Sequence, residues 1–410
     1  MKSRDFSETV NQMPDRRQFF RRLGRNLLGA SAALSFTPVF GKAAADAGGA
    51  SEQKSEVTLP GRLGNPDLTM ADDPRLDPRV ARVMAGMPPG GPAAMLPKVK
   101  LSSSYEECLA WVAAMENLQD RQNAGALAAM PDFSDIVTEK QTIIGVDDNN
   151  IDLYVERPKG IQDVMPCIVH IHGGGMAFTT TQAAAATRWR KTLARKGLLV
   201  VGVEFRNAGG VLGNHPFPAG LNDCASAVQW VNKNRIKLGV SSVVVAGESG
   251  GGNLAVATAV KANNEGWVGA IDGVFAMAPM ILGFYKSIPS ELTAWRENEG
   301  YQGTPEMMRA MTKVYDPKDE HETNPMAWPF HATGKDLKGL PPHIIINYEM
   351  DLIRDEGAVF ARKLQALGVS AMSKTIDGAP HVMEIAMPDL VPELVQDTVG
   401  SLTEFARTFS

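Results

Sequence analysis

The stretch Val243-Val244-Val245-Ala246-Gly247-Glu248-Ser249-Gly250-Gly251 places a serine between an apolar run and a predicted helix that begins near Asn253. The apolar run is typical of a buried strand, and the five residues after it fit the pattern G-x-S-x-G. A serine at a sharp strand-to-helix turn projects at the sheet edge, where the dipoles of the following helix favour negative charge. This context predicts a nucleophile at Ser249, although the five letters alone would also fit a glycine-rich turn or a phosphate-binding loop.

From about residue 135, short apolar runs alternate with segments of helical character. The predicted strands are 141–146, 150–156, 167–171, 198–203, 243–246, 274–277, 344–346 and 370–376. The predicted helices are 184–196, 219–237, 251–264 and 355–367. Continuous β-branched runs are typical of parallel strands that helices cover on both faces. The alternation therefore predicts an α/β fold with a mostly parallel central sheet and helices on both of its faces.

Two regions differ from this alternation. Residues 46–134 begin as an arm rich in Gly, Pro, Ala and Asp and continue into a predicted helix at 104–129, which Ser104 can cap. Residues from about 280 to 340 are rich in aromatic and methionine side chains without a clear strand. We expect this insertion and the helix to form a cap over the sheet edge, within an α/β domain that spans 135–410. Bulky cap candidates for a closed substrate pocket are Met280, Phe284, Tyr285, Trp295 and Trp328, and the core of the cap is the alternative place for such side chains.

The motif His172-Gly173-Gly174-Gly175 directly follows the predicted strand 167–171. Successive glycines leave backbone N–H groups unshielded, so these groups can point at an oxyanion together with the amide of Gly250. Such a donor is typically worth about 3–4 kcal/mol in the transition state. His170 and His172 share one strand face and would also suit a metal pair, but no third ligand lies nearby in sequence. We expect His172 to shape the glycine loop.

The general base is expected near the C-terminus, because a loop after the last strands carries the histidine in the chain order Ser, Asp, His. His381 lies in such a loop, after the predicted strand 370–376. The acid is expected after the strand 344–346, where four carboxylates follow: Glu349, Asp351, Asp355 and Glu356. Asp351 is favoured because it falls at the strand-to-helix turn, and Glu349 is the second choice. The other two begin a helix and can serve as charges at its N-terminus.

These motifs together resemble those of the hormone-sensitive-lipase family of α/β-hydrolases. The matching stretches are His172-Gly-Gly-Gly175, Gly247-Glu-Ser-Gly-Gly-Gly-Asn253, Asp351-Leu-Ile-Arg-Asp-Glu-Gly357 and His381. The similarity extends over essentially the whole chain after the first 45 residues. Three positions depart from the pattern of many relatives: Glu248 and Gly250 replace Asp and Ala beside the serine, and Leu352 replaces a proline after Asp351.

The resemblance implies an α/β-hydrolase fold with a helical cap and a carboxylesterase that acts on short acyl esters. It implies a catalytic triad of Ser249, Asp351 and His381. The oxyanion hole would be formed by Gly173, Gly174 and Gly250. Neither a metal nor an organic cofactor is implied. A serine amidase or peptidase and a small-molecule binding protein on a non-catalytic scaffold are the alternatives.

Composition restricts the partners. The formal net charge is −5, and an acidic protein repels phosphate backbones, which argues against nucleic acid. No run of about eighteen apolar residues is present, which argues against a membrane span. The expected partner is a small-molecule ester, and the sequence leaves a homodimer open.

Residues 1–45 form a basic segment with a net charge of +5. Asp15-Arg16-Arg17-Gln18-Phe19-Phe20-Arg21 has the paired arginines of a twin-arginine signal, and a mildly apolar stretch at 27–40 follows it. Cleavage after Ala45 or Ala47 would fit the small residues there. We therefore expect export by the twin-arginine route to the periplasm or the medium; an unstructured basic tail is the alternative.

Export should depend on the arginine pair. Replacing Arg16 and Arg17 together by lysine keeps the charge but removes the feature that the twin-arginine machinery reads. We expect periplasmic ester hydrolysis to disappear while cytoplasmic activity is retained, measured in fractionated cells. Unchanged export of the double variant would contradict this route.

Overall fold

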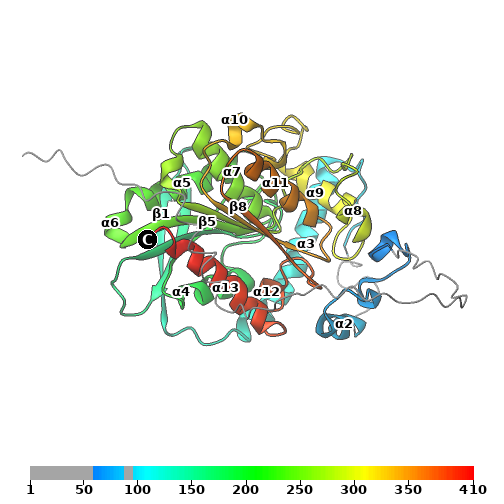
Figure 1. The fold of residues 1–410 in the computed structure, drawn as a ribbon, viewed down its shortest axis with the longest axis horizontal. Coiled ribbons are helices and arrows are strands. Elements are labelled where there is room, and N and C mark those ends of the chain that lie inside the picture. Colours follow the sequence, from blue (N-terminus) through cyan, green and yellow to red (C-terminus); the bar gives the residue numbers. More distant parts are fainter. Residues whose placement is uncertain (1–58, 87–95) are drawn as a thin grey trace, which may run out of the picture. The chain divides into compact units, whose positions relative to one another are not determined.

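The computed structural model describes residues 59–86 and 96–410, so the expected export segment 1–45 lies outside the described residues. Within the described part, one eight-stranded sheet has the order β1-β2-β4-β3-β5-β6-β7-β8 (Figure 1). The strands are β1 Ile136–Ile144, β2 Asn150–Pro158, β3 Met165–Ile171, β4 Leu199–Glu204, β5 Val240–Glu248, β6 Gly273–Met277, β7 His343–Tyr348 and β8 Ala371–Ile376. β2 is antiparallel to β1 and β4, and every pair from β4 to β8 is parallel. The predicted fold class is confirmed.

The pattern of burial explains why the inner strands are continuous apolar runs. Every residue of β3, β6 and β7 is buried, whereas β1 at the sheet edge is buried only near its two ends. Strands with helices on both faces bury successive side chains in both directions. The core therefore lies on both sides of the central strands, and the polar residues at their carboxyl ends are left to form a site.

Helices cover both faces of this sheet. α5 and α7 pack together on one face, with α11 beside them on β7 and β8; α4 and α13 pack together on the other (Figure 1). The α-helices are α2 Pro78–Ala85, α3 Tyr105–Ala128, α4 Ala184–Ala194, α5 Ala219–Lys233, α6 Arg235–Leu238, α7 Gly250–Asn264, α8 Ala294–Glu297, α9 Pro305–Tyr315, α10 Gly334–Leu337, α11 Arg354–Ala366, α12 Met383–Ala386 and α13 Pro392–Arg407. The predicted helix 219–237 is interrupted at Asn234, which separates α5 from α6. In the described ranges, no helix is both long and apolar enough to cross a bilayer.

The cap region consists of α3 and the segment between β6 and β7. Ser104 and Glu107 form a capping box at the start of α3, with the Ser104 N–H to Glu107 Oε2 distance at 2.8 Å. This reciprocal pair satisfies two backbone donors that the first turn leaves free. Residues 280–340, all of them described, contain α8, α9 and α10 and no strand. α9 packs along α3 (Figure 1).

A buried ion pair joins the sheet to α4. The Arg190 Nε atom lies 3.1 Å from Glu156 Oε2 of β2, and both side chains are almost completely buried. Arg190 Nη1 also donates to the carbonyl and hydroxyl oxygens of Thr181, in the loop before α4. Gly202 of β4 allows this approach, because a Cβ there would lie 2.6 Å from Arg190 Nε. The guanidinium therefore connects two strands, a helix and the loop that leads to the site.

Arg190→Met should destabilise the fold by about 3–5 kcal/mol, because it leaves the Glu156 carboxylate buried without a partner. The free energy of unfolding in urea is the measurement. The double variant Glu156→Leu/Arg190→Met is the control and should recover most of the loss, since it removes both charges. Equal instability of the single and double variants would contradict the charge-pair explanation.

Candidate active site

Ser249 occupies a strained turn between β5 and α7. Its φ is 55° and its ψ is −119°, a conformation that non-glycine residues rarely adopt. The Ser249 N–H donates to Met277 O of β6 at 2.8 Å. A side chain at Gly247 would lie 2.7 Å from Ile171 O, and one at Gly251 would clash with the same oxygen. The small neighbours of Ser249 are therefore required by the close approach of β3 to this turn.

The structure brings Asp351 and His381 together from two loops. Asp351 follows β7, His381 lies between β8 and α12, and Asp351 Oδ2 is 2.6 Å from His381 Nδ1. The second oxygen of Asp351 accepts the Ile353 N–H at 3.1 Å. Burial lowers the pKa of His381, but the charge and hydrogen bond of Asp351 outweigh it and raise the pKa above its ordinary value. The imidazole is thus oriented with Nδ1 toward the acid, which leaves Nε2 for a reacting group.

Glu349, the second-choice acid, holds a different part of this loop. Its Oε2 accepts the Gly378 N–H at 2.6 Å. The Gly378 carbonyl in turn accepts the N–H of Asp77, just before α2, at 2.9 Å. The His381 N–H donates to Gln302 Oε1 at 2.7 Å. The N-terminal arm and the cap segment therefore both support the loop that carries His381.

In the glycine loop after β3, one of the three predicted oxyanion donors already has a hydrogen-bond acceptor. The Gly173 N–H donates to Glu248 Oε1 at 2.9 Å, so this group is already occupied and is not free for an oxyanion. Within the described ranges, no acceptor receives the N–H groups of Gly174, Gly175 or Gly250. A Cβ at Gly250 would lie 2.6 Å from Gly175 N, so the helix start and the loop meet here. The unoccupied Gly175 amide therefore lies beside Gly250, the residue that follows Ser249.

Glu248 also contacts His170, one of the two histidines that would suit a metal pair. No sequence motif predicted either contact of Glu248. His170 Nε2 lies 3.0 Å from Glu248 Oε2. His172 stacks on Phe205 with ring centroids 4.4 Å apart, and its Nδ1 donates to Gly173 O at 2.9 Å. Burial lowers the pKa of His172 to about 4, so the ring is neutral at pH 7. His172 shapes the glycine loop, as predicted. No group of three metal-ligand side chains forms among the described residues.

A cavity of about 560 Å³ lies over these groups and includes Ser249, Asp351 and His381 in its wall. Its apolar lining comes from α3, α9 and the loops, namely Trp111, Met115, Phe178, Met307, Met308, Met311, Leu352 and Ile353. The five bulky cap residues expected to form this pocket are absent from its lining. Four of them, Met280, Tyr285, Trp295 and Trp328, are buried in the core. Aromatic composition did not distinguish cap core from pocket wall.

Glu356 also differs from its predicted role. It lies in the first turn of α11 but is fully buried, and its Oε2 accepts the N–H groups of Ile281 and Leu282, both at 2.8 Å. Burial raises the pKa of Glu356 to about 8. This carboxyl group is an anchor for the start of the cap segment rather than an exposed helix charge.

Comparison with known proteins agrees with this geometry. A family profile for the alpha/beta hydrolase fold matches residues 168–385. The solved structure of brefeldin A esterase, described as a bacterial homologue of human hormone sensitive lipase, superposes with a TM-score of 0.77 at 39% identity, covering 86% of this chain and 99% of that one. The chain belongs to the α/β-hydrolase fold family. The resemblance to the hormone-sensitive-lipase group is confirmed.

Two further α/β-hydrolase relatives are similar. Carboxylesterase NlhH of Mycobacterium tuberculosis is 30% identical over 227 residues, which cover 54% of this chain and 67% of the relative. The structure of esterase Est22 has a TM-score of 0.73 at 34% identity and covers 83% of this chain and 99% of that one. The similarity therefore includes the cap and both ends of the sheet.

Asp351→Asn should lower kcat by roughly four orders of magnitude, because an amide stabilises the wrong tautomer of His381. Glu349→Gln is the matched control and should cost far less, since its contact is with a backbone N–H. The pH profile of kcat/KM adds a second readout. The wild-type acid limb should lie above the ordinary histidine pKa, because Asp351 raises the pKa of His381 and only the neutral ring acts as a base.

In Asp351→Asn the acid limb should move to lower pH. A larger loss in Glu349→Gln than in Asp351→Asn would assign the acid role to Glu349 instead.

Proposed function

We propose that this protein is a serine carboxylesterase that hydrolyses short- to medium-chain esters through an acyl-enzyme intermediate. The observation that carries the proposal is the convergence of three features on one cavity. They are the strained Ser249, the Asp351–His381 pair at 2.6 Å, and the unoccupied amides of Gly174 and Gly175. The unoccupied amide of Gly250 directly follows Ser249 in the chain. The esterase names of the similar proteins agree with this chemistry.

Acylation begins when Ser249 Oγ attacks the ester carbonyl carbon and His381 Nε2 takes the hydroxyl proton. Asp351 keeps the Nδ1–H of His381 in place and stabilises the imidazolium. The carbonyl oxygen becomes an oxyanion and accepts hydrogen bonds from the Gly174, Gly175 and Gly250 amides. The bond to the alcohol oxygen then breaks, and His381 gives its proton to the leaving alcohol.

Deacylation repeats these steps with water as the nucleophile. His381 takes a proton from the water as its oxygen attacks the acyl carbon, and the same amides hold the second oxyanion. The bond to Ser249 Oγ then breaks, and His381 returns the proton to the serine. The products are a carboxylic acid and a regenerated hydroxyl, with no change in oxidation state.

The cavity lining supports neutral substrates of limited length. Its wall contains methionine and aromatic side chains, and none of the lining residues is a lysine or an arginine that would attract an anionic acyl group. Methionines of α9, including Met311 against Gly175, close the space above the glycine loop. Each buried methylene improves binding by about 0.8 kcal/mol until this space is full.

On p-nitrophenyl esters, kcat/KM should peak at acyl chains of roughly two to eight carbons and decline beyond, because further methylenes no longer find apolar space. p-Nitroacetanilide should be hydrolysed far more slowly than p-nitrophenyl acetate. Ser249→Ala is the control and should retain the fold while losing turnover. A profile that still rises at palmitate would contradict the closed pocket, and comparable anilide hydrolysis would favour an amidase.

A further inference from the structure

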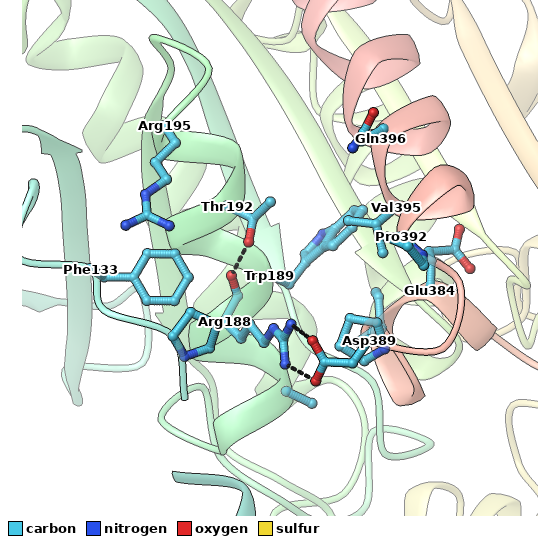
Figure 2. A pocket seen from close by; sticks show the side chains of 14 residues that line it. Phe133, Arg188, Trp189, Thr192, Arg195, Glu384, Asp389, Pro392, Val395 and Gln396 are labelled. Carbon is cyan, nitrogen blue, oxygen red and sulfur yellow. Dashed lines mark hydrogen bonds and ion pairs between the residues drawn. The ribbon is translucent and has the colours of Figure 1, made fainter. Parts of the chain in front are cut away.

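A second hollow lies between α4, α12 and α13, outside the catalytic cavity. Figure 2 shows this groove, whose volume is about 280 Å³. Its wall is largely apolar, with Phe133, Trp189, Pro392 and Val395 facing it (Figure 2). None of these four residues lines the catalytic cavity.

The arginines at the groove are already paired with carboxylates. The other acidic side chain in its wall, Glu384, accepts hydrogen bonds from Tyr348 and Thr398, and burial raises its pKa. Arg188 of α4 forms two hydrogen bonds to the Asp389 carboxylate, which join the α4 side to the segment before α13 (Figure 2). The Arg195 guanidinium lies 4.2 Å from the centre of the Phe133 ring and binds Asp135. No unpaired charge is therefore presented by these arginines, and the groove suits an uncharged apolar group.

The groove and the catalytic cavity share a wall. Ala185 and Ile385 line both spaces. Ala185 is an exposed residue near the start of α4, and Ile385 lies in α12, four residues after His381. A methyl group and one branched side chain are thus the border that the two spaces have in common, and a substrate that reaches from one space into the other has to pass these two side chains.

The positions of His381 and of the glycine amides determine which half of an ester would extend toward the groove. His381 must reach the leaving alcohol oxygen, while the carbonyl oxygen lies at the amides of Gly174, Gly175 and Gly250. The alcohol half therefore lies on the His381 side, beside Val382, Ile385 and Ala386. The acyl half is left with the space under α3 and α9.

We propose that the groove between α4, α12 and α13 binds the distal apolar part of the alcohol half of the ester substrate. This inference rests on the proposed esterase function and adds a specificity to it. The acyl side is bordered by methionines, whereas Ala185 and Ile385 on the alcohol side border the groove as well. The enzyme would then accept long or bulky alcohol groups but only short- to medium-chain acyl groups.

Two isomeric esters test this asymmetry, because 4-octylphenyl acetate and phenyl decanoate have the same atoms and nearly the same leaving-group acidity. The ten-carbon acyl chain exceeds the length that the acyl side accommodates. In wild-type protein, kcat/KM divided by the hydroxide-catalysed rate should therefore be at least tenfold higher for 4-octylphenyl acetate. Each methylene that gains apolar contact should contribute up to about fourfold. A normalised ratio near one, or a preference for phenyl decanoate, would overturn the proposal.

Variants of the groove give the second readout. Val395→Trp should fill the groove and lower the ratio for the isomeric pair about tenfold, mainly through KM. Gln396→Trp, at an exposed groove position, should also lower this ratio, and it replaces Val395→Trp in the test if that variant folds poorly. Ala113→Trp places the same side chain on an exposed site of α3 that lines neither space, and it should keep the wild-type ratio.

Failure of the esterase function and failure of the groove proposal give different results in these assays. Wild-type protein that does not hydrolyse phenyl acetate would contradict the esterase function itself. Hydrolysis of phenyl acetate with an isomer ratio that folded groove variants leave unchanged would leave the esterase function intact and overturn the role of the groove.

Discussion

The close approach of β3 to the turn at Ser249 is the constraint on which the rest of the site depends. The Ile171 carbonyl lies so near Gly247 and Gly251 that neither position has room for a side chain. This contact holds Ser249 in its strained conformation and brings the glycine loop, which follows β3, next to the start of α7. The proposed nucleophile and the proposed oxyanion donors are therefore positioned by one backbone contact between two central strands.

Buried carboxylates extend this arrangement to the surrounding loops. Glu248 binds the Gly173 N–H, Glu356 binds two N–H groups at the start of the cap segment, and Glu116 of α3 binds the Thr179 and Val211 N–H groups at 2.9 and 2.7 Å. In each case a side chain on a regular element accepts hydrogen bonds from an irregular loop. Loops that line a cavity cannot satisfy all of their backbone donors with water, so these acceptors stabilise one conformation.

Hydrogen bonds join the cap elements to the loops of the candidate site. Glu116 connects α3 to the glycine loop, and Gln302 from the cap segment accepts the His381 N–H. The elements that enclose the substrate thus also support the residues that would react with it. Substrate size and catalytic geometry are expected to respond together to changes in this region.

Local sequence patterns predicted the eight strands, the helices α3, α4, α5, α7 and α11, and the meeting of Asp351 with His381, because strand-to-helix turns at the carboxyl ends of parallel strands converge. They did not predict α9 or α13. They did not predict what depends on three-dimensional packing. The Gly173 N–H donates to Glu248. The sequence signals for this contact were the position of Glu248 directly before Ser249 and the presence of Glu where many relatives have Asp. Periodicity also cannot separate Met311, which lines the cavity, from Trp328, which is buried in the core.

Ser249 Oγ is the proposed attacking atom, and covalent trapping identifies this atom by its product. Diethyl p-nitrophenyl phosphate should react once per chain: Ser249 Oγ displaces p-nitrophenolate from phosphorus, and His381 accepts the hydroxyl proton. Peptide mass spectrometry should place one diethylphosphoryl group on Ser249, in proportion to the loss of ester hydrolysis and to the p-nitrophenolate released. Full inactivation with the label on another residue, or undiminished hydrolysis after Ser249 is labelled, would contradict the role of Ser249 as the nucleophile.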